Sequence, residues 1–255
     1  MNELREQVRE KYAERAVKIA MQAADTGCCG EAEGATCGEA DDPICAERYS
    51  PEELASVGFA PTASLGCGNP TLLADLHPGE TVLDLGSGAG LDVLLSARRV
   101  SPGGRAYGVD MTDEMLALAR ANQAKAGVAN ATFLKGTIEV VPLPDASVDV
   151  IISNCVINLA ADKSAVLKEA FRLLRPGGRL AVSDMIALEE LAPEAKRNLD
   201  LWAGCVAGTI SREAYLAGLR SAGFGQVEIE VTREVTLEGV TGRIASASIR
   251  AVRPV

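Results

Sequence analysis

Hydrophobic and polar residues follow two alternating patterns along the central part of the chain. Short apolar runs typical of strands are followed by longer segments with helical spacing. The predicted strands cover 81–85, 105–109, 131–134, 148–153 and 179–183, and the predicted helices cover 90–100, 112–126 and 162–174. Strands and helices that alternate in this way are typical of a parallel sheet with helices on both faces. We therefore predict an α/β, doubly wound fold.

The segments before this sheet predict a helical N-terminal region. Apolar residues near helical spacing indicate a helix over 2–24, which we expect to pack across the mouth of the main domain. A short helix is predicted over Ser50–Val57, because proline stands at its first helical position and acids in its first turn. We assign residues 1–70 to an N-terminal helix, a cysteine-rich loop and a cap, and residues 71–255 to the main domain.

The segments after residue 185 predict two helices and then two strands. The helices are expected over 193–204 and 212–222, and an insert around 190–222 contains both. Two β-rich runs follow, over 226–233 and 243–252. We expect these runs to close the sheet, one of them antiparallel, which gives seven strands in all.

Composition and charge restrict the class of protein. The formal net charge of -10 disfavours nucleic acid and anionic membranes as partners, because phosphate groups attract Lys and Arg. Neither an apolar run long enough to span a bilayer nor a signal-peptide pattern is found. These features predict a cytoplasmic globular protein that is large enough to bury a full hydrophobic core.

The unusual feature of the composition is its cysteines: Cys28, Cys29, Cys37, Cys45, Cys67, Cys155 and Cys205. Their number is odd and the expected compartment is reducing, so a structural disulfide framework is not expected. Metal binding, redox chemistry and inert buried thiols stay open, and Cys45 fits the last of these. The chain has one histidine, His77, and its adjacent Cys28-Cys29 pair lacks the Cys-x-x-Cys spacing of structural zinc.

A glycine-rich turn follows the strand over 81–85, in the sequence Asp84-Leu85-Gly86-Ser87-Gly88-Ala89-Gly90. Glycines there let the backbone turn sharply and approach a ligand closely. Asp110 ends the next strand, twenty positions after Gly90, where an acid accepts hydrogen bonds from ribose hydroxyls. The two features together predict a nucleotide-type cofactor cleft at the carboxyl ends of the strands, and Cys155 follows another of these strands.

These segments, together with Gly136–Glu139 and Pro176–Asp184, resemble the motifs of class I S-adenosylmethionine-dependent methyltransferases. The resemblance covers roughly residues 79–185, and it implies a Rossmann-like sheet and S-adenosylmethionine as cofactor. It places Asp84 near the methionine moiety, Asp110 on the ribose and Met111 beside the adenine, with Ile138 and Glu139 lining the adenine ring. The further cofactor-binding residues that it implies are Gly86, Ser87, Gly88 and Asn154.

A narrower resemblance, to the arsenite S-adenosylmethionine methyltransferases, spans almost the whole chain. Four segments carry it: Asn154–Leu159, Gly66–Pro70, Trp202–Cys205 and the Cys28-Cys29 loop. The resemblance implies that Cys155 and Cys205 hold trivalent arsenic, with Cys67 as a third functional thiol. It also implies one relay cysteine in the first loop, for which Cys28, Cys29 and Cys37 are candidates and Cys29 is favoured. Longer family members have a further C-terminal region that this chain lacks.

The chemistry of arsenic fits this cysteine set. Trivalent arsenic is soft and prefers thiolate ligands, and three thiolates leave it a lone pair that can attack the sulfonium methyl group without a general base. We expect a detoxification enzyme that methylates arsenite and then methylarsenite, with arsenic arriving as a thiol conjugate and glutathione or thioredoxin as reductant. Two alternatives remain: a small-metabolite C- or O-methyltransferase with incidental cysteines, and a thiol-based metalloid-binding protein without catalysis.

Overall fold

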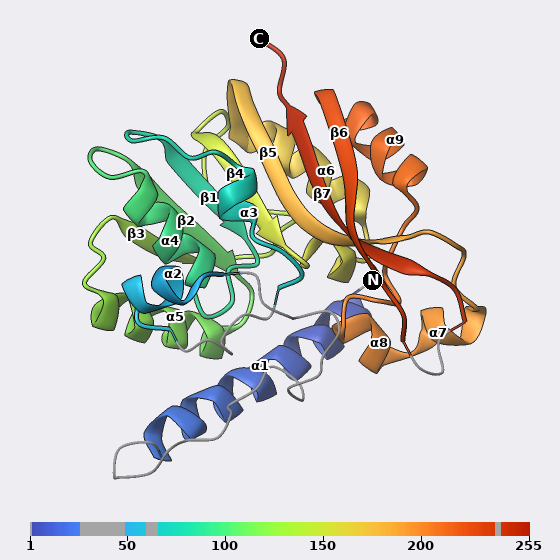
Figure 1. Cartoon of the computed structure of the whole chain (residues 1–255), viewed down its shortest axis with the longest axis horizontal. Helices are drawn as coiled ribbons and strands as arrows, with labels where there is room; N and C mark the ends of the chain where they lie inside the picture. The colour runs from blue at the N-terminus through green and yellow to red at the C-terminus, as the bar shows by residue number, and fades with distance from the viewer. Residues whose placement is uncertain (1, 26–48, 60–65, 238–240) are drawn as a thin grey trace.

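The computed structural model describes residues 2–25, 49–59, 66–237 and 241–255, and a seven-stranded sheet forms its centre (Figure 1). The strand order is β3-β2-β1-β4-β5-β7-β6. The strands are β1 (Thr81–Leu85), β2 (Arg105–Asp110), β3 (Ala131–Lys135), β4 (Val148–Asn154), β5 (Leu174–Ala187), β6 (Gly225–Val235) and β7 (Ile244–Val252). The first five pair in parallel, whereas β7 runs antiparallel to both β5 and β6. The predicted Rossmann-like, mostly parallel sheet is confirmed.

Helices cover both faces of this sheet, because successive residues of a strand point to opposite faces. Leu83 and Leu85 of β1 belong to the core beneath α6 (Lys163–Leu173) and α9 (Arg212–Ala222). Val82 of the same strand belongs to a smaller core on the other face, with Ala74 just after α3 (Pro70–Leu73). The strands are therefore apolar on both sides, which explains their near-continuous hydrophobic runs.

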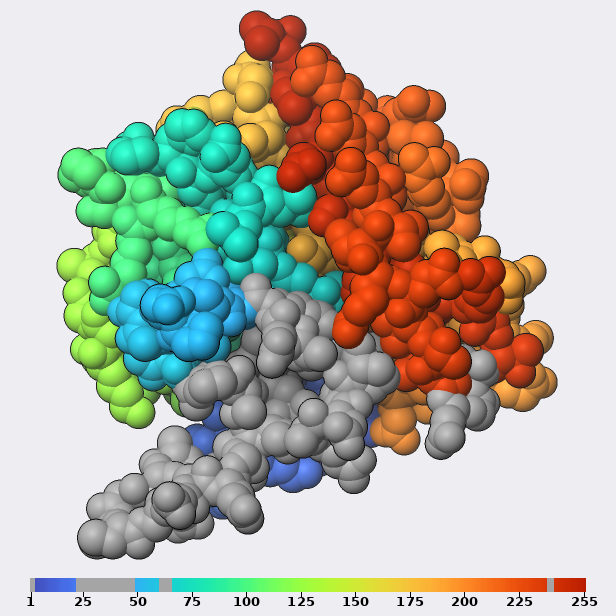
Figure 2. Space-filling model, in the orientation of Figure 1, coloured from blue at the N-terminus to red at the C-terminus, as the bar shows by residue number. Residues whose placement is uncertain are grey.

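The N-terminal region packs against the main domain. Helix α1 (Asn2–Asp25) crosses the end of the sheet and contacts α5 (Asp113–Ala126) and α8 (Leu199–Ala203), as predicted (Figure 1). Helix α2 (Pro51–Ser56) shares a hydrophobic core with α4 (Leu91–Arg99) and α5, and Figure 2 shows it seated on that part of the surface. Its start is a capping box between Ser50 and Glu53.

Two predicted boundaries were wrong. The helix predicted over 193–204 is divided into α7 (Pro193–Arg197) and α8, because the side chain of Asn198 accepts the backbone N–H groups of Asp200 and Leu201 and caps a new helix. Strand β5 begins at Leu174 instead of residue 179, since Leu174 already pairs with Val148 before a register shift.

None of the helices within the described ranges combines the length and the apolar character that a membrane crossing requires.

Candidate cofactor and thiol site

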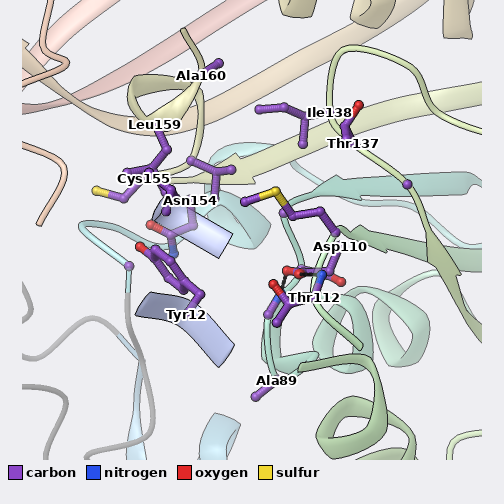
Figure 3. A pocket seen from close by; sticks show the side chains of 18 of the residues that line it. Tyr12, Ala89, Asp110, Thr112, Thr137, Ile138, Asn154, Cys155, Leu159 and Ala160 are labelled. Carbon is purple, nitrogen blue, oxygen red and sulfur yellow. Dashed lines mark hydrogen bonds between the residues drawn. The ribbon is translucent and has the colours of Figure 1, made fainter. Parts of the chain in front are cut away.

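A pocket of about 1050 Å³ of empty space, part of it open to solvent, lies at the carboxyl ends of β1, β2 and β4. The loops that follow these strands line it, and α1 contributes Arg5, Val8 and Tyr12. Figure 3 shows Asn154 and Cys155 on one side of this pocket and Asp110 and Ile138 on the other. The predicted residues that line it are Gly86, Ser87, Gly88, Asp110, Met111, Ile138, Glu139, Asn154 and Cys155.

The glycine-rich turn forms one wall of the pocket through left-handed backbone. Gly86 has a φ of 75° and Gly88 a φ of 47°, in the region that side chains with a Cβ rarely adopt. A Cβ at Gly86 would also lie 2.4 Å from a methyl carbon of Val156. The turn therefore presents backbone to the pocket and closely approaches the segment after β4.

Asp110 fixes this turn from the end of β2. Its carboxylate accepts a hydrogen bond from the backbone N–H of Gly88 at 2.9 Å and another from that of Thr112 at 2.8 Å. Burial raises its pKa, although these hydrogen bonds oppose the shift. Asp110 is thus rigidly held in the position from which an acid binds ribose hydroxyls.

Asp84 lies beneath the turn, 3% exposed, and is not among the described residues that line the pocket. Its Oδ1 and the hydroxyl of Ser87 are buried polar atoms that have no hydrogen-bond partner within the described part of the chain. Burial raises the pKa of Asp84 well above its usual range, and the carboxyl groups of Asp92 and Asp110 raise it further. An unsatisfied carboxyl oxygen beneath the turn suits a ligand that brings positive charge and hydrogen-bond donors to this end of the pocket.

S-adenosylmethionine has these properties, since it carries a sulfonium, an ammonium and two ribose hydroxyls. Asp110 would hold the ribose, and Met111 and Ile138 offer apolar surface to the adenine. The acidic groups beside the turn would stabilise the cationic end. The residues present therefore fit this cofactor.

A polar network beside the turn was not predicted from the sequence. The hydroxyl of Tyr49 donates to Oδ1 of Asp92 at 2.6 Å, and Nδ2 of Asn154 donates to the Tyr49 oxygen at 3.0 Å and to Oδ2 of Asp92 at 3.3 Å. Burial raises the pKa of Asp92 to about 6. A carboxylate in the first turn of a helix usually marks a favourable helix start, so Asp92 carried no functional signal.

Three cysteines, which we call the thiol site, converge next to the pocket: Cys67, Cys155 and Cys205. A disulfide joins Cys67 and Cys155, whose Cα atoms lie 5.7 Å apart, and the Cys205 thiol donates a hydrogen bond to the Cys155 carbonyl oxygen at 2.7 Å. All three side chains are at most 5% exposed, in one apolar cluster with Met185 and Leu191. The predicted grouping of these cysteines agrees with this arrangement, and Cys29 lies outside the described residues.

The disulfide corrects one expectation from the sequence. Cys67 and Cys155 were expected as thiols in a chain without structural disulfides, yet they are 88 positions apart and bonded. The turn before α3 and the end of β4 meet at one edge of the sheet, which sequence distance does not reveal. Among the described residues no group of three metal-ligating side chains is arranged for an ion.

The backbone at the thiol site is strained at two cysteines. Cys155 has a φ of 59° and Cys205 a φ of 61°, both in the left-handed region. Such a conformation costs on the order of 1–3 kcal/mol in a residue other than glycine, and it concentrates at functional sites. The surrounding fold thus holds the two cysteines in place at an energetic cost.

A second buried carboxyl group lies behind the thiol site. Asp184 is fully buried in β5, and its Oδ1 accepts hydrogen bonds from Nδ2 of Asn158 at 2.7 Å and from the N–H of Met185 at 2.9 Å. The hydroxyl of Tyr215 approaches Oδ2 at 3.5 Å. Burial raises the pKa of Asp184 to about 7, and nearby Lys163 opposes the shift. This group therefore titrates near neutral pH.

We expect Asp184→Asn to become more stable relative to the native chain as the pH rises. The pKa of Asp184 is higher in the folded state than in the unfolded state, so the folded native chain binds one more proton between about pH 4 and 7. As the pH rises through this range, the native chain loses up to about 1.4 kcal/mol of stability per pH unit. Asparagine does not titrate. Urea unfolding of both chains at about pH 5 and about pH 8 measures the difference. A difference that is the same at both values would contradict the assignment.

Comparison with known proteins also indicates a methyltransferase. A family model described as a methyltransferase domain matches residues 76–228. A relative from Halobacterium salinarum, described as an arsenite methyltransferase, is 43% identical over 242 residues, which are 92% of this chain and 60% of the relative. The arsenite methyltransferase of Mus musculus is 35% identical over 66% of this chain and 49% of its own length. The chain thus spans about half to three fifths of the length of these two relatives.

A solved structure is matched over a larger share of its own length than either relative. The arsenic (III) S-adenosylmethionine methyltransferase from Chlamydomonas reinhardtii aligns with a TM-score of 0.68 and 32% identity over 81% of this chain and 75% of that one. The chain belongs to the methyltransferase family. Within that family, these comparisons relate it to the arsenite methyltransferases.

Asp110→Ala is expected to weaken S-adenosylmethionine binding by about tenfold or more, because each charge-assisted hydrogen bond to the ribose contributes about 1.5–3 kcal/mol. The matched control is Asp113→Ala, which removes an exposed acid that pairs with Lys135 on the surface. Titration calorimetry on both variants measures the effect. An Asp110→Ala affinity equal to that of the control would exclude the ribose role.

Proposed function

We propose that this protein methylates trivalent arsenic, first as arsenite and then as methylarsenite, with S-adenosylmethionine as methyl donor. The observation that supports this most directly is the position of the thiol site. Cys155 lines the cofactor pocket itself and contacts both Cys67 and Cys205. Reduction of the Cys67–Cys155 disulfide would therefore give three soft thiols next to the cofactor pocket. Relatives named as arsenite methyltransferases are similar over most of this chain.

Different residues serve the cofactor pocket and the thiol site. S-adenosylmethionine, when bound, supplies an electrophilic methyl group. Asp110 and the turn from Gly86 to Gly90 orient the nucleoside, and the thiolates of Cys155 and Cys205 hold arsenic at the pocket wall. The apolar cluster around the thiol site excludes water, so the arsenic lone pair is not hydrated. Catalysis is then chiefly by proximity, and the arsenic lone pair needs no general base.

A thiol reductant completes the proposal. Glutathione or thioredoxin donates two electrons to the Cys67–Cys155 disulfide and leaves two thiols that bind arsenic. We expect arsenic to arrive as a thiol conjugate, exchanging one sulfur ligand for another. A reducing compartment favours both steps, which is why we place the protein in the cytoplasm.

The test is an incubation of reduced protein with arsenite and methyl-labelled S-adenosylmethionine, followed by separation of the arsenic species. Labelled methylarsenic species would support the proposal. Label on added small metabolites and none on arsenic would favour a carbon or oxygen methyltransferase. Bound arsenite without any labelled product would indicate a metalloid-binding protein.

A further inference from the structure

The side chain of Asn154 joins the loop that carries Cys67 to the end of β4, directly before Cys155. Its Oδ1 accepts hydrogen bonds from the backbone N–H groups of Cys67 at 2.9 Å and Gly68 at 3.2 Å. Its Nδ2 donates to the carbonyl oxygen of Gly68 at 2.8 Å. One side chain thus makes three hydrogen bonds to two consecutive residues of a loop that is distant in sequence.

The same loop lies close against the sheet because two of its residues are glycines. A Cβ at Gly66 would lie 2.1 Å from Cγ of Asn154, and a Cβ at Gly68 would lie 2.4 Å from the hydroxyl oxygen of Ser183. From β7, the hydroxyl of Ser246 donates to the carbonyl oxygen of Cys67 at 3.3 Å. The glycines on either side of Cys67 are therefore needed for close approach, and Asn154 is the surface that Gly66 approaches.

The remaining contacts of Asn154 fix which way its amide points. Nδ2 also faces Oδ2 of Asp92 and the hydroxyl oxygen of Tyr49, and that hydroxyl gives its proton to Asp92. These neighbours accept hydrogen bonds, so they select the amide nitrogen and leave the oxygen for the two loop N–H groups. The orientation that holds Cys67 is thus imposed by the cofactor side of the site.

We propose that Asn154 is a positioning residue for the thiol site. It holds the backbone of Cys67 within reach of Cys155, so that both sulfurs meet on one arsenic atom. Asn154 acts through Cys67 and does not itself bind arsenic. The inference rests on the proposed function in naming arsenic, but the placement of the two sulfurs is measurable without it.

The first experiment therefore uses no arsenic. Cys67 and Cys155 give two electrons and two protons to glutathione disulfide, which forms two glutathione thiols while the protein disulfide forms. The equilibrium constant of this exchange reports how well the fold holds the two sulfurs together, and mass spectrometry of the peptides that contain them follows it. We expect Asn154→Ala to lower the constant at least about tenfold, because three hydrogen bonds to the loop are lost.

The matched control is Asn130→Ala, since Asn130 also donates side-chain hydrogen bonds to two backbone carbonyls, of Ala97 and Gly104, away from the thiol site. Its constant should equal that of the native chain. Asn154→Ser provides the same comparison if the alanine variant does not fold. A constant for the Asn154 variants equal to the control would overturn the proposal, and a loss confined to S-adenosylmethionine affinity would assign Asn154 to the cofactor instead.

A second experiment extends the proposal to turnover. With Cys67 displaced, Asn154→Ala should lose more of its rate on arsenite, which takes three sulfur ligands, than on methylarsenite, which takes two. An equal loss on both substrates would contradict a role through Cys67. If the native chain methylates neither substrate, the proposed function fails, and the exchange constant still decides the role of Asn154.

Discussion

Cys155→Ser and Cys205→Ser should each abolish methylation of both arsenite and methylarsenite, while S-adenosylmethionine still binds. In the proposed function both substrates are held by these two sulfur ligands, and a serine hydroxyl is a hard, protonated group that cannot replace a thiolate. Both cysteines are buried at strained backbone positions, where serine is the smallest change of chemistry available. The measurements are initial rates on each substrate and cofactor affinity by calorimetry, all with reduced protein.

The control for these variants is Cys45→Ser, since the sequence predicts that Cys45 has no functional role. It should retain the native rates. Near-native turnover of either the Cys155 or the Cys205 variant on both substrates would remove that residue from the arsenic site. Loss of cofactor binding in the Cys155 variant would instead indicate that this position serves the pocket that it lines.

Cys67→Ser should lose the first methylation far more than the second. Arsenite can take three sulfur ligands, whereas methylarsenite already has one bond to carbon and takes two, which in our proposal come from Cys155 and Cys205. A loss on arsenite that exceeds the loss on methylarsenite by about tenfold corresponds to about 1.4 kcal/mol, a small part of one ligand bond. The same comparison for Cys29→Ser tests the relay thiol favoured by the resemblance.

Paired rates on both substrates separate the remaining roles of these two cysteines. Equal losses on arsenite and methylarsenite would exclude a substrate-dependent third ligand and leave a redox or structural role. Native rates on both substrates would make Cys67 and Cys29 dispensable. Because Cys67 is bonded to Cys155 in this structure, each assay compares variants after full reduction.

The central sheet was predictable because its strands are buried on both faces, which produces short apolar runs between helical patterns. The glycine turn and Asp110 were predictable for a similar reason, since each stands at the end of a strand where the chain order shows it. The division between α7 and α8 was not predicted, because the decision rests on one capping side chain, Asn198, inside a helical pattern.

The long-range contacts of the site could not be predicted from the sequence. Tyr49 and Asp92 are 43 positions apart, and their hydrogen bond forms because α2 and α4 share a hydrophobic core. The resemblance grouped Cys67 with Cys155, but their bond was not predicted. The expected reducing compartment argued against disulfides, and nothing in the sequence shows that this pair is close enough to form one. Asn154 was assigned to the cofactor by the family resemblance alone. Its contacts with the Cys67 loop became visible only in the fold.

X-ray absorption of arsenic bound to the reduced protein tests the central claim most directly, because it counts the atoms that arsenic contacts. We expect three sulfur neighbours for arsenite in the native chain, and two sulfurs with one carbon for methylarsenite. We also expect arsenite to lose one sulfur neighbour in Cys67→Ser and in Cys155→Ser. Oxygen or nitrogen neighbours in the native chain, or a sulfur count unchanged in both variants, would contradict an arsenic site built from Cys67, Cys155 and Cys205.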